Sequence, residues 1–512
     1  MPMINQENSS FYLANEAYPV LYAYGQKGNL TVSTEKPEED PFFQLPNLTA
    51  EDFGDPEFKK NYGLKYALYG GAMANGIASS DMVIALGKAG CMGSYGSGGQ
   101  RLEIVEQEID KIKAALGDKP YMINMLSNRN GEMEMKLAKL LVEKEVPAVE
   151  ASAYIVPSEA LVYFRVKGVH EDADGRIAIP HKIIAKVSRE EVLEKFVSPP
   201  PAESVASLLN AGLITAQEAA LAAKIPMADD ITAEADSGGH TDGRPMVSML
   251  PALIALANRK QSEFGYQQKV RVGAGGGVGT GLSCLGAFEM GAAYVATGSV
   301  NQGCVESGTS DYVKQVLAET AMADVTMAPC ADMFEMGAKV EVIKKKTMYA
   351  QNAQKLYEYY VKYPSFDAIP AAERDRIEKK ILKDSFDNIW KGTKEYFSRV
   401  DPGKIPQAER NPKMKMALVF RWYLGNSSRW AVQGNPDRKF DMQIWCGQSM
   451  GAFNLWVKGT PLEKAENRHV GEVAGLLLSS CAYHYMKNLL VRMGIPAETF
   501  REDILEDFFH AE

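Results

Sequence analysis

The sequence is poor in the features that mark membrane-spanning, secreted and nucleic-acid-binding proteins. Its 512 residues contain no run of about 18 consecutive apolar residues, so no membrane span is predicted. The first residues, MPMINQENSSFYLANEAYP, lack a basic stretch followed by an apolar core. We therefore expect no secretory signal and a cytoplasmic protein. The net charge is −9, whereas nucleic-acid binding requires a basic surface, so no nucleic-acid partner is expected.

Disulfide and metal-site patterns are also scarce. The six cysteines contain no C-x-x-C pair, which favours reduced thiols over a disulfide framework or a zinc site. The six histidines include no pair with the H-x-x-x-H spacing of metal-binding helices. The sequence therefore predicts no metal centre.

Short apolar runs alternate with amphipathic, helix-like stretches from about residue 62 to residue 300. Apolar runs without polar alternation are typical of parallel strands that are buried on both faces. Eight such strands predict a (β/α)8 barrel, with an open doubly wound sheet as the alternative. The expected strands are YALYG (66–70), CMGSY (91–95), YMINM (121–125), PAVEAS (147–152), KIIAKV (182–187), DITAEA (230–235), VRVGA (270–274) and AYVAT (293–297).

The pattern predicts three consecutive segments in the chain. Residues 1–60 are polar and loop-like, residues 61–329 form the barrel, and residues 330–512 form a mainly helical extension. Helical spacing of apolar residues is present over 337–363 and 371–400. Within the barrel we expect a small hairpin in 153–181 and an excursion of helices in 189–227.

Glycine-rich motifs follow the last three expected strands. EADSGGHTDG (234–243) follows strand six, GAGGGVGTG (273–281) follows strand seven, and VATGSV (295–300) includes the end of strand eight. Loops after barrel strands form the active-site face. The glycines would let backbone N–H groups approach an anion, and a helix starting near residue 281 adds its positive end. A tight turn without a ligand is the alternative. The predicted phosphate-binding residues are Gly275, Gly276, Gly277, Gly298 and Ser299.

Two earlier strands also end in residues that suit a flat ligand. YGGAMANG (69–76) follows the first strand, where small residues would let a ring lie against the backbone. Asn124 ends the third strand and offers an amide for hydrogen bonds. Taken singly, each is equally explained as a turn residue or a loop-satisfying side chain.

The order of these motifs resembles that of flavin-dependent nitronate monooxygenases and FabK-type enoyl reductases. Segments such as ADMFEMGAKVEVIKKKTMYAQNA, RWYLGNSSRW and QIWCGQSMGAFNLWVKG are most similar to one branch, the trans-acting PfaD-like enoyl reductases of polyunsaturated fatty acid and polyketide synthases. The likeness runs from about residue 60 to residue 490. It implies a TIM barrel that binds FMN, takes electrons from NADPH or NADH, and reduces an enoyl thioester on acyl carrier protein.

The resemblance also assigns expected roles to individual residues. By position in the motifs, the residues expected to contact FMN are Gly71, Ala72, Met73, Asn124, Lys186, Glu234, Ala235 and Gly239, together with the phosphate-binding glycines and Ser299. The FabK-like branch usually reads EAGGH, whereas this chain reads EADSGGH, with Asp236 and Ser237 as additional residues.

His240 is the expected catalytic residue. Enoyl reduction builds negative charge on the thioester oxygen and then requires a proton at the α-carbon. An imidazole with a pKa near neutrality supplies a hydrogen bond or that proton. We expect the glycines to bring His240 over the flavin and Asp242 to orient it; a histidine that bonds only to the local turn is the alternative.

The helical extension suggests partners. The run Lys344-Lys345-Lys346 would suit the acidic surface of a carrier protein, although an exposed basic face is the simpler explanation. The aromatic residues of 412–458 either line an acyl tunnel or form plain core. Apolar extensions often bury at dimer interfaces, which leaves a homodimer open. The rival functions are a nitronate monooxygenase that uses FMN and O₂, and a non-catalytic flavin-binding scaffold.

Overall fold

The computed structural model describes residues 3–26, 29–38, 40–128 and 131–509. The chain forms two compact units. The barrel unit consists of Met1–Asp236, Asp242–Gly308 and Ala452–Glu512, and the helical unit consists of Ser237–Thr241 and Thr309–Gly451. The functional division at residues 60 and 329 stays a prediction, while the packing joins residues 452–509 to the barrel unit.

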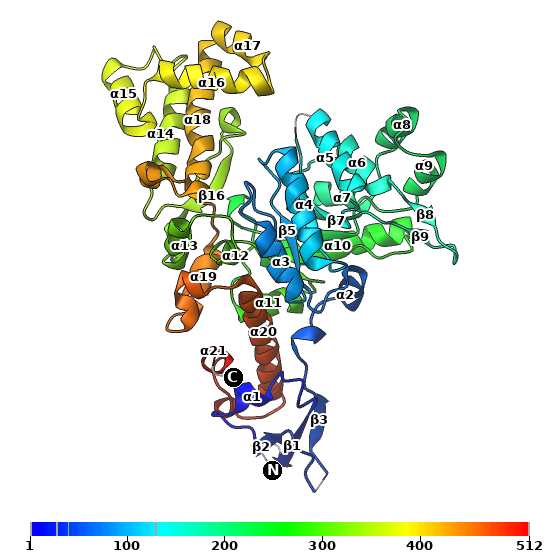
Figure 1. Cartoon of the computed structure of the whole chain (residues 1–512). Helices are drawn as coiled ribbons and strands as arrows, with labels where there is room; N and C mark the ends of the chain where they lie inside the picture. The colour runs from blue at the N-terminus through cyan, green and yellow to red at the C-terminus, as the bar shows by residue number, and fades with distance from the viewer. Residues whose placement is uncertain (1–2, 27–28, 39, 129–130, 510–512) are drawn as a thin grey trace. The chain divides into compact units, whose positions relative to one another are not determined.

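Eight parallel strands close a barrel within the barrel unit (Figure 1). All eight predicted strands are present, within a few residues of the expected bounds. They are β4 (Leu68–Gly70), β5 (Met92–Tyr95), β6 (Met122–Leu126), β7 (Ala148–Ser152), β10 (Lys182–Val187), β11 (Asp230–Glu234), β13 (Arg271–Gly275) and β14 (Val295–Thr297). Their order around the barrel is β10-β11-β13-β14-β4-β5-β6-β7, and every neighbouring pair is parallel. The (β/α)8 prediction is confirmed and the open sheet is excluded.

Burial explains why the strands were readable from the sequence. Every residue of β4, β5 and β13 is buried. This is expected for barrel strands, because one face of each strand packs in the barrel interior and the other face is covered by helices. The ladder is in register at positions such as Tyr69↔Met92 and Ala274↔Val295. Because the strands are parallel, their carboxyl ends meet at one end of the barrel.

Helices surround the barrel (Figure 1). Several begin at a side-chain cap: Ser79 accepts from the N–H of Met82, and Ser158 accepts from that of Leu161. The helices between barrel strands are α3 (Ser80–Lys88), α4 (Leu102–Leu116), α5 (Gly131–Glu143), α6 (Glu159–Val166), α7 (Glu190–Val197), α8 (Ala202–Asn210), α9 (Ala216–Ala222), α10 (Met246–Phe264) and α11 (Gly281–Glu289), and α12 (Ser299–Gln302) follows the last barrel strand. The predicted hairpin is β8 (His170–Glu171) with β9 (Ile177–Ala178), and α7 to α9 form the predicted excursion.

The N-terminal segment is more ordered than its polar composition suggested. It contains α1 (Ser9–Tyr12), a sheet of β1 (Val20–Gln26), β2 (Asn29–Ser33) and β3 (Phe43–Pro46), the short helix η1 (Ala50–Asp52) and α2 (Pro56–Tyr62). The expectation of loop was wrong here because alternate residues such as Leu21 and Ala23 are buried, which is the period of a strand.

Residues 452–509 pack in the barrel unit. The helix α20 (Val470–Arg492) packs on α11. The short helix α21 (Leu505–Phe508) follows, with the 3-10 turns η6 (Pro461–Glu463), η7 (Ala465–Asn467) and η8 (Ala497–Thr499). Asp503 accepts hydrogen bonds from Trp456 Nε1 (2.8 Å), His484 Nε2 (3.0 Å) and Ser480 Oγ (3.2 Å), and so fastens this segment.

The helical unit contains a sheet that the sequence did not predict. Its strands are β12 (Gly239–His240), β16 (Lys339–Ile343) and β15 (Val325–Pro329), in that antiparallel order. The start of the expected helix at 337–363 is therefore wrong. Val340 and Val342 are both buried and follow the two-residue period of a strand, and the helix α14 begins only at Tyr349.

The remaining elements of the helical unit are helices. They are α13 (Asp311–Ala318), η2 (Met322–Asp324), η3 (Phe334–Met336), α14 (Tyr349–Lys362), α15 (Ala371–Arg376), the π-helix η4 (Ile377–Leu382), α16 (Phe386–Val400), α17 (Lys404–Arg410), α18 (Pro412–Gln433), η5 (Pro436–Asp441) and the first residues of α19 (Gln448–Trp456). Tyr423 is fully buried, and Trp422, Trp430 and Trp445 pack against the same core. These aromatic residues therefore serve as core.

No disulfide joins any of the six cysteines, and all six are buried. Among the described residues, no helix combines the length and apolarity required to cross a bilayer.

Candidate active site

The segment after β4 is anchored by a buried carboxylate. Gly71 N–H donates to Thr297 O (2.9 Å), and Ala72 N–H donates to Glu150 Oε2 (2.7 Å). Met73 O accepts from the N–H of Ala78 at 3.1 Å, which folds the segment back on itself. The three residues predicted to lie along the flavin ring therefore form one fixed loop at the carboxyl end of the barrel.

Glu150 is a site residue that the sequence reasoning missed. It lies in β7 and its side chain has no exposed surface. A carboxylate inside the apolar run PAVEAS is the signal that was available, because a buried charge requires partners. Its partners come from other strands: Tyr69 Oη donates to Oε1 at 3.4 Å, and Lys186 Nζ lies 3.8 Å from Oε1.

Lys186 joins Glu150 to Glu234. Its ammonium lies 2.6 Å from Glu234 Oε1, at the ends of the neighbouring strands β10 and β11. Burial alone would lower the pKa of Lys186, but the charges of Glu234 and Glu150 outweigh burial and raise it. The ammonium is thus charged at neutral pH and counters two carboxylates.

Asn124 is held in one orientation by β7. Its Nδ2 donates to Glu150 O at 2.9 Å and to Ser152 Oγ at 3.0 Å. With both amide hydrogens engaged, Oδ1 is the atom that remains for a ligand. We therefore expect Asn124 to accept a hydrogen bond from a ring N–H rather than to donate one.

The loop after β13 has the geometry of an anion cradle. Gly276 and Gly277 have φ of +87° and +74°, and Ala235 N–H donates to Gly275 O at 2.8 Å. A Cβ on Gly276 would lie 2.7 Å from Ala235 O, so only glycine fits there. The helix α11 begins at Gly281, as predicted.

The cradle fits the phosphate of FMN. In the described part of the chain, the backbone N–H groups of Gly276, Gly277 and Gly298 have no protein acceptor. A Cβ on Gly298 would meet nothing within 4 Å, and one on Gly277 would meet only Met246 Cε at 4.0 Å. Open space beside unengaged donors is what an anion requires, and the positive end of α11 adds to it.

Gly239 and His240 belong to the helical unit, whereas the other predicted residues belong to the barrel unit. They form β12, in which Gly239 pairs with Glu341 and His240 pairs with Val340. A Cβ on Gly238 would lie 2.7 Å from the backbone of Cys446, and Gly239 has φ of +84°. The two glycines are therefore needed to seat His240 in this sheet.

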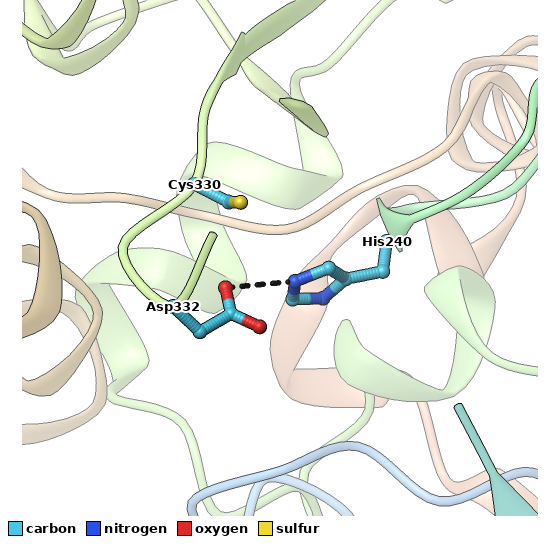
Figure 2. A group of neighbouring side chains, drawn as sticks. All are labelled: His240, Cys330 and Asp332. Atoms are coloured by element: carbon cyan, nitrogen blue, oxygen red, sulfur yellow. Dashed lines mark hydrogen bonds and ion pairs between the residues drawn. The ribbon is translucent and has the colours of Figure 1, made fainter. Parts of the chain in front are cut away.

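The partner of His240 is Asp332 (Figure 2). His240 Nε2 lies 3.1 Å from Asp332 Oδ1, and the Cys330 thiol lies beside them. Asp242, which the sequence reasoning expected to orient His240, instead accepts from Ser188 Oγ (2.6 Å) and Arg189 Nε (2.9 Å). The expectation for Asp242 was wrong because Arg189, a stronger donor, lies within reach.

Electrostatics favour a charged His240. Burial lowers the pKa of His240, but the hydrogen bond and charge of Asp332, together with the hydrogen bond of Cys330, outweigh burial and raise the pKa to about 10. Burial likewise raises the pKa of Asp332, but His240 outweighs it and lowers the pKa to about 2. The pair is thus an imidazolium and a carboxylate at neutral pH.

The three side chains are also of types that bind metal ions. The ligand atoms of His240, Cys330 and Asp332 all lie within 4.8 Å of one another. Cysteine, histidine and aspartate are zinc ligands in proteins. The absence of a metal centre stays a prediction from the sequence.

A serine motif in the chain lacks the geometry of a hydrolase. GQSMG (447–451) has the G-x-S-x-G spacing of a nucleophile elbow, in which the serine sits on a strained turn. Ser449 does not have a positive φ, so its backbone lacks the strain of a nucleophile elbow.

Two family models match the chain. A family model described as nitronate monooxygenase matches residues 57–383. A second, described as the inserted helical domain of acyl-carrier-protein S-malonyltransferase, matches residues 363–442.

Individual relatives come from two kinds of synthase. The chain is 47% identical over 420 residues to a component of the polyunsaturated fatty acid synthase of Thraustochytrium sp., a match that covers 81% of this chain and 28% of that protein. It is 43% identical over 472 residues to polyketide biosynthesis protein PksE of Bacillus subtilis, a match that covers 92% of this chain and 61% of that protein. The chain thus spans only part of the length of these relatives.

A solved structure matches over its whole length. The enoyl reductase domain of MlnA, from the macrolactin biosynthesis cluster of Bacillus amyloliquefaciens, is 38% identical with a TM-score of 0.82. The match covers 86% of this chain and 100% of that domain.

Proposed function

The chain belongs to the nitronate monooxygenase family and is related to enoyl reductase domains of polyketide and polyunsaturated fatty acid synthases, and we propose that it is an FMN-dependent enoyl reductase. The substrate would be a 2,3-enoyl thioester on acyl carrier protein, and the reductant NADPH or NADH. The observation that carries the proposal is the match to the entire MlnA enoyl reductase domain.

The barrel unit supports the cofactor part of the proposal. Gly276, Gly277 and Gly298 would hold the FMN phosphate through backbone N–H groups, with Gly275 and Ser299 beside them. The loop Gly71–Met73 and Asn124 Oδ1 would contact the ring. When bound and reduced by NAD(P)H, FMN supplies the hydride for the β-carbon of the enoyl thioester.

The protein's own residues would handle the remaining charge and proton. His240 carries a proton in its ion pair with Asp332, so it is suited to donate to the thioester oxygen or to the α-carbon. Lys186 pairs with both Glu234 and Glu150, and it would hold these two carboxylates in place next to the cofactor.

The carrier-protein part of the proposal has separate support. The matched inserted helical domain is described for an enzyme that acts on acyl carrier protein, and it covers residues 363–442 of the helical unit. The relatives named for polyketide and fatty acid synthesis are consistent with a carrier-bound substrate.

The test is a flavin reduction and reoxidation experiment. Purified protein should show the absorbance of FMN, and anaerobic NADPH should bleach it. A crotonyl-type thioester should then restore the colour without O₂. Protein that is colourless and cannot be loaded with FMN would refute the proposal, and a flavin that neither NADPH nor NADH can bleach would indicate a scaffold without catalysis.

The name of the matching family model favours nitronate monooxygenase as the second candidate function. That reaction consumes O₂ and a nitronate, whereas enoyl reduction requires neither. Nitronate-dependent O₂ uptake with no anaerobic turnover of the thioester would select the second candidate.

A further inference from the structure

We propose that His240, Cys330 and Asp332 form a binding site for a zinc ion, and that Zn²⁺ bound there inhibits the enzyme by occupying His240. The metal site follows from the geometry of the helical unit alone. Its inhibitory effect rests on the proposed function, in which His240 supplies a proton. Separate measurements test the binding and the inhibition.

The three side chains supply donor atoms that zinc prefers. They offer one imidazole nitrogen, one thiol sulfur and one carboxylate oxygen, and these atoms all lie within 4.8 Å of one another (Figure 2). Among the residues that the structure describes, this is the only group of three or more histidine, cysteine or acidic side chains with such spacing. Short spacing motifs cannot reveal it, because Asp332 is 92 positions from His240 in the sequence.

The separations suit a tetrahedral ion after a small adjustment. Zinc bonds of about 2.0–2.3 Å place neighbouring ligand atoms about 3.3–3.6 Å apart in a tetrahedron. His240 Nε2 and Asp332 Oδ1 already lie 3.1 Å apart. The largest separation in the group therefore exceeds the required one by no more than about 1.5 Å. Rotations of the His240 and Asp332 side chains, which are 49% and 60% exposed, can close such a gap.

One sheet holds all three ligands. His240 lies in β12, which pairs with one edge of β16, and Cys330 directly follows β15, which pairs with the other edge. Cys330 N–H donates to Ala338 O at 3.0 Å, which closes the base of the connection that carries Cys330 and Asp332. Because backbone hydrogen bonds set these positions, an ion requires movement of side chains alone, which lowers the cost of binding.

Charge and exposure favour an exchangeable ion. A thiolate and a carboxylate carry two negative charges, so with a neutral imidazole as third ligand they neutralise Zn²⁺. Binding releases the Cys330 thiol proton and the Nε2 proton of His240 to the solvent. Cys330 is buried, whereas His240 and Asp332 are exposed and leave a path for the ion. Three protein ligands also leave the fourth position of the zinc ion for water.

Zinc at this position would withdraw His240 from the proposed reaction. An imidazolium carries two ring protons, whereas a ring that binds zinc through Nε2 carries at most one and is no longer an acid near neutral pH. Proton delivery to the thioester would then slow. Reduction of the flavin by NADPH does not use this proton. We therefore expect zinc to inhibit the reduction of the thioester and to spare the reduction of the flavin.

The first experiment measures zinc binding to the chelator-treated full chain, with and without FMN, by calorimetric titration with ZnCl₂. One ion per chain should bind with a micromolar or lower Kd. Zinc X-ray absorption of the complex should show one sulfur ligand at about 2.3 Å, with nitrogen and oxygen ligands at about 2.0 Å. A complex without a sulfur ligand, or a chain that binds no stoichiometric zinc, would overturn the proposal.

Two variants remove a ligand each. Cys330→Ser and Asp332→Asn should weaken zinc binding more than about 100-fold, because even the loss of a group behind a ligand costs about 10–100-fold. Asp332 is exposed, so Asp332→Asn tests the site even if replacement of the buried Cys330 prevents folding. Wild-type zinc affinity in Asp332→Asn would overturn the proposal.

The matched control is His469→Gln. His469 Nδ1 lies 3.3 Å from Glu306 Oε1, and the side chain of His469 is 60% exposed. This pair resembles that of His240 and Asp332, but in the described part of the chain no cysteine completes a group around it. His469→Gln should therefore bind zinc as tightly as the wild type. Equal losses in His469→Gln and Asp332→Asn would indicate scattered surface binding and would overturn the proposed site.

The second experiment follows the flavin absorbance under anaerobic conditions with and without ZnCl₂. At free zinc of about ten times Kd, reoxidation by a crotonyl-type thioester should slow about 10-fold, because about one molecule in eleven lacks zinc. Bleaching by NADPH should keep its rate. In Asp332→Asn, the same zinc concentration should leave the reoxidation rate of that variant unchanged. Equal slowing of both steps, or faster reoxidation with zinc, would overturn the inhibitory role.

The two experiments separate failure of this inference from failure of the proposed function. If zinc binds with a sulfur ligand that Cys330→Ser removes, but no enoyl thioester is reduced, the function is wrong and the metal site stands. If the thioester is reduced but no zinc binds, the function stands and the inference is wrong.

Discussion

Lys186 and Glu234 form an ion pair of 2.6 Å at the carboxyl ends of the neighbouring strands β10 and β11. The same ammonium lies 3.8 Å from Glu150, whose side chain has no exposure to solvent. One cation therefore counters two carboxylates at the end of the barrel where the predicted cofactor residues gather. Removing it would leave two acidic groups with no opposite charge.

Lys186→Met should destabilise the protein by about 2–4 kcal/mol and weaken FMN retention, because it leaves buried carboxylates uncompensated. Thermal unfolding and flavin content check this.

The matched control is Lys136→Met. Lys136 forms an ion pair of 2.7 Å with Glu132, but both side chains are more than half exposed. A surface pair of this kind contributes at most about 1 kcal/mol, so its loss should change neither unfolding nor flavin content appreciably. Equal effects at both lysines would contradict a special role for Lys186.

The barrel could be predicted because its signal is local. The barrel strands contain short apolar runs, and strands such as β5 and β13 are buried throughout, so the local sequence was enough to find them. The strand β16, KVEVI, was missed because its partners β12 and β15 are set by tertiary packing, and its two-residue period was overlooked beside the helical spacing of α14. Local pattern does not report which distant strand pairs with it.

The site residues show the same difference between local signals, which the sequence reveals, and tertiary contacts, which it does not. The glycines of the cradle were found because a cluster of glycines is visible in the sequence. Glu150 and Asp332 were missed because their partners are distant: Asp332 is 92 positions from His240. Asp242 was chosen for its proximity in sequence, yet its carboxylate is engaged by Ser188 and Arg189.

Gly276→Ala should abolish FMN retention and lower stability by about 2 kcal/mol or more. Its φ of +87° disfavours a side chain, and the new Cβ would lie 2.7 Å from Ala235 O. Gly286→Ala, within α11, is the control, since its Cβ meets nothing within 4 Å and alanine favours a helix. Flavin fluorescence after gel filtration distinguishes them, and full retention by Gly276→Ala would argue against the cradle.

Asp503→Asn should lower the melting temperature by several degrees at neutral pH, through a loss of about 1–3 kcal/mol. Burial raises the pKa of Asp503, but hydrogen bonds from His484 and Trp456 outweigh it and lower the pKa. The ionised carboxylate therefore stabilises above its ordinary pKa of about 3.8, and the deficit should shrink as pH falls below that value.

Glu57→Gln is the control for Asp503→Asn, because Glu57 is 65% exposed in its pair with Lys60. Its melting temperature should match the wild type at every pH. A constant difference for Asp503→Asn down to the most acidic sample would contradict the role of its charge.

Lys344→Glu should raise KM for a carrier-bound enoyl substrate several-fold without changing KM for a small thioester. Lys344 is exposed, whereas Lys345 lies 3.3 Å from Asp324 and Lys346 lies 2.5 Å from Glu319. Reversal at Lys344 thus leaves both of those ion pairs intact. Steady-state kinetics with both substrates check it, and an equal change in both KM values would refute docking at this position.

The embedding of Ser237–Thr241 in the helical unit has a consequence for anyone who exchanges parts between homologues. The backbone passes from one unit to the other after Asp236, Thr241, Gly308 and Gly451. A graft that replaces only the long stretch from residue 309 to residue 451 would keep the host's β12 against a foreign β16. A working chimaera must therefore exchange Ser237–Thr241 and Thr309–Gly451 together.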